Sequence, residues 1–521
     1  MKRLYTRILL AASVLLSTSC SDWLDLQPEG EATHDELYST GSGYRTVLNG
    51  LYRNMGKKDL YGCQLQFGLV DCMSQQYDLT NSTTTTDQAL IKASEFNYND
   101  YNVAGITDKV WSSAYNVIAT GNDLLQNIEN ASPDLFDYGE MERDLIKGEA
   151  LACRALLHFD LLRLFAPAPV NDDGQSYVPY LESYPNITAS RIPVKEYLEK
   201  VIRDLEEARG LIKTFDLSDD GIQANSTVNY RFSKSVGSTG LPQFFCGRAY
   251  RLNYHAVTAL LARVYQYAGG AEREKLAFDC ASELINQKDN GAVYYFDNFE
   301  GITTPSSQEN LTPLEKFDTK DDLKARSSLI FSVYNEKSFE ENSLDYYFKR
   351  PDKNNQLTSV SWLPVRVEAL FGDELGSDLR ATQWLCNIDG THYISGKWYM
   401  NPVETVRDAN ANILPVIRLT EMVYIAAEYQ ARNNHFTEAY KLLNDLRAAR
   451  KLDKLPETGT WAEFQADLIK EARREWISEG QLFYLYKRLD AEVSVFSNKG
   501  EEVRKLTKGE LSIPVPTNQI N

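Results

Sequence analysis

The sequence is poor in positive charge and in cysteine, and each shortage excludes a class of protein. Its 521 residues include 55 lysines and arginines against 73 aspartates and glutamates, a formal net charge of −18. This balance argues against nucleic acid or anionic lipid as the main partner. It suits a neutral or peptide ligand better than a polyanion, unless a local patch overrides it. Seven cysteines are too few for a disulfide-built scaffold, so the fold must come from packing of the 43% hydrophobic residues.

Catalytic signatures are also missing. The chain has no GxSxG, no HExxH and no glycine-rich phosphate loop. Its five histidines are His34, His158, His255, His392 and His435, and none has metal-ligand spacing. A secreted glycoside hydrolase stays open as an alternative, because it needs only two carboxylates about 5–10 Å apart and an acidic chain always offers such a pair.

The N-terminus indicates export. Residues 1–19 combine a basic start, with Lys2 and Arg3, and an apolar run over 8–16 that is too short to span a bilayer. Small residues, Leu-Ser-Thr-Ser, then lead to Cys20, which resembles the lipobox of bacterial lipoproteins. We predict that 1–19 is a signal peptide and that Cys20 becomes the lipid-modified N-terminus, with several acyl chains anchoring the protein. The alternative is an ordinary cleavage site with an incidental cysteine.

The remaining cysteines form no CxxC pair and have no zinc spacing. Cys153 and Cys280 lie in helical apolar patterns, which is typical of small buried hydrophobic residues. Whether Cys63 and Cys72 form a disulfide depends on geometry that the sequence does not give.

Apolar residues recur at helical spacing along much of the chain. The segments with this pattern are 140–166, 193–213, 250–268, 271–287, 416–432, 436–450 and 461–489. Short breaks such as Gly269-Gly270 and Asn433-Asn434-His435 join neighbouring segments. The pattern predicts a mostly α-helical protein built from stacked helical hairpins like those of tetratricopeptide repeats.

Irregular stretches interrupt these hairpins. Residues 214–249, 289–415 and 72–105 are rich in polar, proline, glycine or aromatic residues and lack a sustained helical period. A few short strands are expected, one of them from Leu329 to Tyr334. Long irregular insertions in a compact protein are usually functional, so we interpret the chain as a helical scaffold that carries such insertions.

Several local patterns together resemble the SusD/RagB family of outer-membrane nutrient-binding lipoproteins, over nearly the whole chain from about Cys20 to Pro516. These patterns are Asp22-Trp23-Leu24-Asp25-Leu26-Gln27-Pro28, Glu149–Ala155 leading into Phe159–Phe165, Arg191-Ile192-Pro193-Val194, Ala259–Tyr265, Pro415–Glu421, and Glu471–Glu475 with Glu479-Gly480. One departure is Ala166-Pro167-Ala168-Pro169, where the family usually turns through glycine.

The resemblance implies a fold of about four helical hairpin pairs supporting an irregular half. It implies a signal peptide over 1–19 and a single body over 20–521, with helical repeats at about 104–166, 192–288 and 415–490 and ligand-site insertions at about 71–101 and 289–415. It also implies a non-catalytic protein at the cell outer membrane. Such a protein captures glycan, or peptide in some branches of the family, and delivers it to a TonB-dependent porin of the SusC type.

Sugar rings stack on aromatic side chains and their hydroxyls need polar partners, so a glycan site needs both kinds of residue. The insertions hold two such mixtures, in the regions where the family binds ligands. The candidate ligand-binding residues are Asp71, Tyr77, Asp78 and Asn81 in the first mixture and Tyr346, Tyr347, Arg350 and Trp362 in the second. Any one of the aromatic residues can instead pack against the scaffold.

The other tryptophans divide by their surroundings. Trp111 and Trp476 lie on helical patterns and are predicted to be in the core. Trp384, Trp398 and Tyr399 lie in the second insertion, and the sequence does not decide between core and surface for them.

No cofactor is predicted. Asp216, Asp219 and Asp220 before Gly221 loosely resemble a calcium loop, which leaves a structural calcium ion as an alternative. They lack the alternate-residue spacing of an EF-hand, and a solvated acidic turn is the favoured interpretation.

Overall fold

The structure is a computed structural model. It describes residues 33–79, 87–185, 190–286, 315, 317–320, 322–348, 363–388, 392–497 and 499–516. The predicted signal peptide and Cys20 lie outside the described residues.

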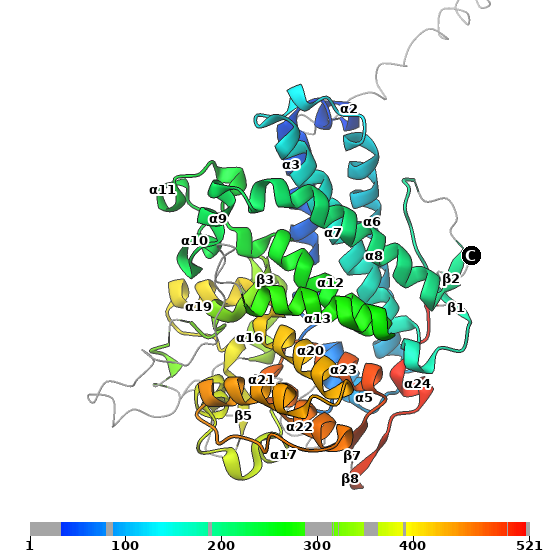
Figure 1. Ribbon diagram of the computed structural model, residues 1–521, viewed down its shortest axis with the longest axis vertical. Helices are drawn as coiled ribbons and strands as arrows, with labels where there is room; N and C mark the ends of the chain where they lie inside the picture. The colour runs from blue at the N-terminus through cyan, green and yellow to red at the C-terminus, as the bar shows by residue number, and fades with distance from the viewer. Residues whose placement is uncertain are drawn as a thin grey trace, which may run out of the picture.

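A stack of helices runs through the molecule. Its members are α3 (Gly41–Met55), α6 (Tyr101–Ile128), α7 (Gly139–Phe165), α8 (Val194–Asp216), α12 (Tyr254–Ala268), α13 (Ala271–Ile285), α20 (Leu419–Arg432), α21 (Phe436–Ala449) and α22 (Trp461–Glu475). Each packs on the next, from α3 on α6 to α21 on α22. In Figure 1 the stack descends from α3 and α6 at the top, through α12 and α13, to α20 and α22 near the bottom. The predicted mostly helical fold is confirmed.

Helix α7 lies at the centre of this stack. Every residue from Leu145 to Phe165 is buried except Lys147, so the helix is covered on all sides. Its polar side chains are therefore paired within the protein: Arg154 Nε donates to Asp204 Oδ2 of α8 at 2.7 Å. Buried His158 accepts at Nε2 from the Leu181 backbone N–H at 3.0 Å, and burial lowers its pKa to about 3.

The expected helical segment over 461–489 is wrong at its centre. Helix α22 ends at Glu475 and α23 (Leu482–Leu489) begins after a turn in which Ser478 and Gly480 have φ of 59° and 67°. A Cβ on Gly480 would lie 2.1 Å from the Leu65 carbonyl oxygen, so this turn packs directly on a distant segment of backbone. The break comes from this long-range contact.

Strand β3 (Leu329–Tyr334) confirms the strand predicted there. It pairs antiparallel with β6 (Ile413–Arg418), which precedes α20 and was not expected. Both strands are almost wholly buried between the helices and the irregular segments. The other pairs are β1 (Ser176–Pro179) with β2 (Arg191–Pro193), β4 (Leu385–Asn387) with β5 (Tyr393–Ser395), and β7 (Glu492–Ser497) with β8 (Gly500–Lys505).

The irregular segments contain only short helices. In the first half of the chain these are α2 (His34–Leu37), α4 (Leu69–Met73), α5 (Gln88–Ser94), η1 (Pro133–Leu135), η2 (Pro169–Asn171), α9 (Asp219–Asn225), α10 (Val228–Phe232), α11 (Val236–Thr239), η3 (Gln243–Phe245) and η4 (Arg248–Tyr250). Later ones are η6 (Arg326–Ser328), α15 (Ser338–Glu341), α16 (Leu344–Tyr347), α17 (Val367–Phe371), η7 (Gly372–Glu374), α18 (Leu379–Trp384), η8 (Gly396–Trp398), α19 (Glu404–Ala411) and α24 (Lys508–Leu511).

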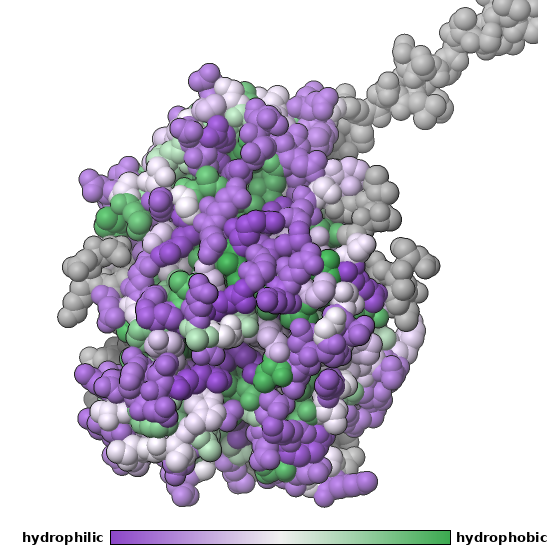
Figure 2. All heavy atoms as spheres, turned by 45° about the vertical axis from the view of Figure 1, so that its right-hand side comes forward, coloured by the Kyte–Doolittle hydropathy of each residue, from purple (hydrophilic) through white to green (hydrophobic). Residues whose placement is uncertain are grey.

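The core extends into this irregular half. Trp111 and Trp476 are buried as predicted, and Trp384, Trp398 and Tyr399 are buried too. The six described cysteines, Cys63 and Cys72 among them, are free and buried. The face shown in Figure 2 is largely hydrophilic, with hydrophobic side chains scattered over it. Among the described residues, no helix is both long and apolar enough to span a membrane.

Candidate functional site

The two regions predicted to hold ligand residues meet in the structure. Asp78 N donates to Pro364 O at 2.7 Å, and Tyr77 forms an isolated antiparallel bridge with Val365. Arg366 N donates to Gln76 O at 2.9 Å. Segments nearly 290 residues apart in sequence are thus joined by backbone hydrogen bonds into one junction.

Three of the predicted ligand residues are buried in this junction. Asp71 is 0% exposed, Tyr77 2% and Tyr347 3%. The Asp71 carboxylate accepts from the Gly480 N–H at 3.0 Å, and burial raises its pKa well above the ordinary value. The Tyr77 hydroxyl lies 2.7 Å from Ser478 Oγ. Both side chains therefore hold the turn between α22 and α23.

Tyr347 connects the two predicted regions by its side chain. Its hydroxyl donates to Asp87 Oδ2 at 2.9 Å. Burial, with Cys63 and Asp87 nearby, raises the Tyr347 pKa above its ordinary value, so the hydroxyl stays a neutral donor. This bond fixes α16 against the start of α5.

Two of the predicted residues reach the surface. Tyr346 is 37% exposed, and its ring lies edge-on to Tyr347 with 5.0 Å between centroids. The Asp78 side chain is 35% exposed and forms an ion pair with Arg366 at 3.3 Å. Asn81, Arg350 and Trp362 lie outside the described residues.

A groove of about 530 Å³ opens beside this junction. It is lined by Gln75, Tyr77, Leu79, Gln88, Ile91, Lys92, Ser94, Glu95, Arg366, Phe496, Ser497 and Lys499. These residues come from the segment 75–79, from α5 and the residue after it, from Arg366 in the segment that pairs with 76–78, and from the β7–β8 hairpin. Its volume lies within the range of about 300–1,000 Å³ that is typical of small-ligand sites.

Arg366 is the central polar group of the groove. Its guanidinium lies 3.8 Å from the centroid of the Phe496 ring, and its Nε donates to Tyr77 O at 3.0 Å. Burial lowers the Arg366 pKa, and the charge of Asp78 opposes this effect. The stacked pair offers hydrogen-bond donors beside an apolar ring, which is the combination that a sugar unit requires.

Gln75 connects two walls of the groove. Its backbone has φ of 64°, its Nε2 donates to Ser94 O at 2.7 Å, and its Oε1 accepts from Phe496 N at 3.1 Å. One side chain thus joins the end of α5 to β7. Sequence reasoning missed Gln75, Arg366 and Phe496, because nothing local links a glutamine to a strand 421 positions later.

One of the three aspartates near α9 is buried and bound by an arginine, and the other two are exposed. Asp216 is buried, and Arg248 Nε and Nη2 donate to its two carboxylate oxygens at 2.9 Å each. Asp219 and Asp220 are exposed in the first turn of α9. Within the part of the chain that the structure describes, no three His, Cys, Asp or Glu side chains are grouped so as to hold a metal ion.

Family models and a curated relative all indicate the same family. A family model described as "Starch-binding associating with outer membrane" matches residues 22–245, and one described as "SusD family" matches residues 375–508. SusD-like protein P2 of Formosa agariphila is 26% identical over 198 residues. That match spans 38% of this chain and only 36% of the relative's length.

Solved structures share the fold over most of the chain. A SusD superfamily protein from Bacteroides thetaiotaomicron matches with a TM-score of 0.65 and 23% identity, covering 92% of this chain and 97% of that one. A SusD-like carbohydrate binding protein from Bacteroides vulgatus matches at 0.63 and 17%, covering 92% and 96%. Surface glycan-binding protein A from B. thetaiotaomicron in complex with laminarihexaose matches at 0.64 and 16%, covering 92% and 97%.

Proposed function

Because this chain belongs to the SusD/RagB family, we propose that it is a non-catalytic, lipid-anchored protein of the outer-membrane surface that captures glycan and passes it to a SusC-like TonB-dependent porin. The laminarihexaose complex of a structural relative supports the glycan as ligand class. Cys20 is the proposed anchor, and the exterior is the proposed side of the membrane.

The observation that carries the proposal is the groove beside the junction. It places Arg366 and Phe496, with their guanidinium-on-ring contact at 3.8 Å, among the polar side chains of α5 and the β7–β8 turn. Among the described residues the groove lining contains the carboxylate of Glu95, and the Asp78 carboxylate next to the groove is engaged in an ion pair with Arg366 at 3.3 Å. Hydrolysis of a glycosidic bond requires two carboxyl groups that both act on the sugar. Capture therefore fits this groove better than cleavage does.

We assign two kinds of role to the predicted residues. Asp78 and Tyr346, at the surface, are proposed to contact the ligand, together with Arg366. Asp71 and Tyr347 are proposed to act by positioning, because their side chains bond to Gly480 N and Asp87 within the protein.

A panel of neutral glycans and of protein digests tests this function. The purified protein is run through native gels that contain each polysaccharide, and new reducing ends are measured in parallel. Retardation by a glycan without release of reducing ends is the expected result. Reducing ends produced by substoichiometric protein would overturn the non-catalytic role, and retention of peptides alone would assign the protein to peptide capture.

The anchor has its own test. Replacing Cys20 with alanine removes the thiol that carries the proposed lipid, so we expect the protein to move from the membrane fraction to the soluble fraction on cell fractionation. The substitution Cys72→Ala, at a buried free cysteine, is the matched control and should leave the distribution unchanged. Membrane association of Cys20→Ala equal to wild type would contradict the lipid anchor.

A further inference from the structure

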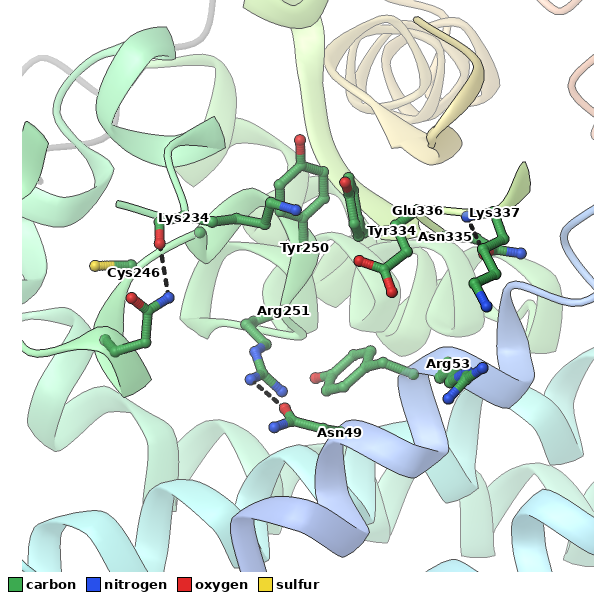
Figure 3. Close-up of a pocket in the computed structure, with 13 residues that line it drawn as sticks. Asn49, Arg53, Lys234, Cys246, Tyr250, Arg251, Tyr334, Asn335, Glu336 and Lys337 are labelled. Atoms are coloured by element: carbon green, nitrogen blue, oxygen red, sulfur yellow. Dashed lines mark hydrogen bonds between the residues drawn. The ribbon is translucent and has the colours of Figure 1, made fainter. Parts of the chain in front are cut away.

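A second cavity, of about 460 Å³, opens on another part of the irregular half. It lies between α3, the segment that ends in η4, and the end of β3 (Figure 3). It shares no lining residue with the groove at the junction. The ligand of this cavity therefore has to be inferred from its own lining residues.

Positive side chains dominate this cavity. Four cations line it, Arg53, Lys234, Arg251 and Lys337, against one carboxylate, that of Glu336. The chain as a whole has a net charge of −18, so this local excess runs opposite to the rest of the molecule. Cations gathered in a concave surface attract anionic ligands and raise their local concentration.

The cations at the rim are available to a ligand. Arg53, Lys234 and Lys337 are exposed, and none of them forms an ion pair with the residues that the structure describes. The fourth cation, Arg251, lies 3.6 Å from the Glu149 carboxylate on its inner side. In Figure 3, Arg53 and Lys337 stand at one end of the cavity and Lys234 at the other. Cations therefore flank the cavity at both ends.

Hydrogen bonds at the surface and in the core hold the floor in place. Arg251 Nη2 donates to Asn49 Oδ1 at 2.6 Å, and its guanidinium lies 4.9 Å from the centroid of the Tyr52 ring. The Tyr52 hydroxyl donates to Glu149 Oε2 at 2.8 Å and accepts from Leu252 N at 2.9 Å. Arg251 is thus oriented before any ligand arrives, which lowers the entropic cost of binding.

The upper wall is aromatic. The rings of Tyr250 and Tyr334 lie 5.0 Å apart, and Lys234 Nζ lies 3.6 Å from the centroid of the Tyr334 ring. Gln243 Nε2 donates to Lys234 O at 2.6 Å and fixes the backbone at that end. Tyrosine rings give a sugar a face to stack on and hydroxyls to hydrogen-bond, a combination that acidic peptide side chains do not need.

We propose that this cavity binds an acidic sugar unit, one that carries a carboxylate or a sulfate ester. The sugar ring packs on Tyr250 and Tyr334, and its anionic group is held by Arg251 with the cations of the rim. The inference rests on the proposed glycan-binding function and specifies part of the ligand. It also revises the expectation, drawn from net charge alone, that a neutral ligand suits this chain best.

Matched pairs of oligosaccharides test the proposal by isothermal titration. One pair is tetragalacturonate and its methyl ester, and the other is a sulfated oligosaccharide and its desulfated form. We expect the acidic member of at least one pair to bind at least about tenfold more tightly, because charge-assisted hydrogen bonds to it are lost in the neutral member. Added salt should weaken only that acidic member.

The triple variant Arg53→Gln, Lys234→Gln, Lys337→Gln should remove this preference and leave binding of a neutral glycan unchanged. The control variant Lys213→Gln, Arg273→Gln, Lys275→Gln makes the same change in net charge on helices α8 and α13 and should keep the preference. Equal binding of acidic and neutral members, equal losses in the two variants, or equally tight binding of polyglutamate would each overturn the acidic-sugar assignment. Wild-type protein that binds no glycan of either kind would overturn the proposed function itself.

Discussion

The repeat helices and the irregular segments share one core, but different interactions stabilise them. Helices such as α12 bury alanine, leucine and valine, and their backbone groups are satisfied within the helix. The irregular segments around α17 and α18 pack instead on a cluster of buried charges, Asp378, Arg380, Glu471, Arg474 and Glu475, each 0–1% exposed. Helix α22 supplies three of these five residues.

The difference follows from where backbone groups find partners. Short helices, helix ends and the open edge of a two-stranded sheet leave carbonyls that have no partner inside the element, and a buried unpaired carbonyl is costly. Arg474 Nε donates to Leu370 O at 2.9 Å and Lys397 Nζ to Glu475 O at 2.6 Å. Gln66 Nε2 donates to Pro415 O at 2.7 Å in the same way. Long polar side chains thus satisfy backbone carbonyls in this half, whereas hydrogen bonds within the long helices satisfy them in the other half.

The largest expected effect comes from breaking the charge cluster. Glu475→Gln removes the carboxylate that Arg450 Nη2 contacts at 2.8 Å and that lies 3.5 Å from Arg380 Nη1, while Arg380 keeps its ion pairs with Asp378 and Glu471. The cluster then holds an excess of buried positive charge, and we expect a loss of about 3–5 kcal/mol in the free energy of unfolding at pH 7. Leu260→Ala in α12, also fully buried, should cost about 2–5 kcal/mol by leaving a cavity. Urea denaturation monitored by circular dichroism measures both.

The pH dependence separates the two variants. Burial raises the Glu475 pKa, but Arg450 and Arg380 outweigh it and lower the pKa from 4.5 to about 2. A depressed carboxyl pKa stabilises the fold above the unfolded value, and this stabilisation is lost as pH falls from 4.5 towards 2. The deficit of Glu475→Gln should shrink over that window while that of Leu260→Ala stays constant. Parallel behaviour of the two would contradict the proposed difference between the halves.

A smaller effect is expected at the turn between α22 and α23. Gly480→Ala adds a Cβ that would lie 2.1 Å from the Leu65 carbonyl at φ of 67°, so backbone must shift. Gly240→Ala has a similar φ of 71° with nothing within 4 Å of the new atom. We expect about 1–2 kcal/mol from the left-handed conformation alone at Gly240 and a clearly larger loss at Gly480. Thermal unfolding of the two variants compares them, and equal losses would show that the contact with Leu65 contributes nothing.

The elements that the sequence predicts well are those that depend on local patterns, and the residues that it places wrongly depend on distant contacts. Helices α7 and α8 and strand β3 follow from local patterns, since periodicity and β-branched residues act within a few positions. The sequence predicts that Asp71 binds ligand, which requires an accessible carboxylate, and polar residues are mostly exposed. Its partner, the Gly480 N–H, is 409 positions away, so no local signal shows that it is buried.

The residues of the site also fall into those that local sequence patterns indicate and those that only tertiary contacts bring in. The sequence identified two insertions as ligand regions, and the structure joins them through Asp78 and Pro364. The groove that results also needs Phe496 from the β7–β8 hairpin, which no pattern near either insertion indicates. Composition marks which segments are irregular, but only tertiary contacts decide which of their side chains face a cavity.

The most direct test of the central claim, capture of glycan at the groove beside the junction, is titration of a retained neutral glycan into wild type, Arg366→Gln and Arg273→Gln. The first substitution removes the guanidinium that stacks on Phe496, and the control removes one from an ion pair with Glu199 on the helices. We predict that Arg366→Gln weakens glycan binding about tenfold, equivalent to about 1.4 kcal/mol, with both variants folded as wild type by circular dichroism. Unchanged affinity in Arg366→Gln, or an equal loss in Arg273→Gln, would contradict the account.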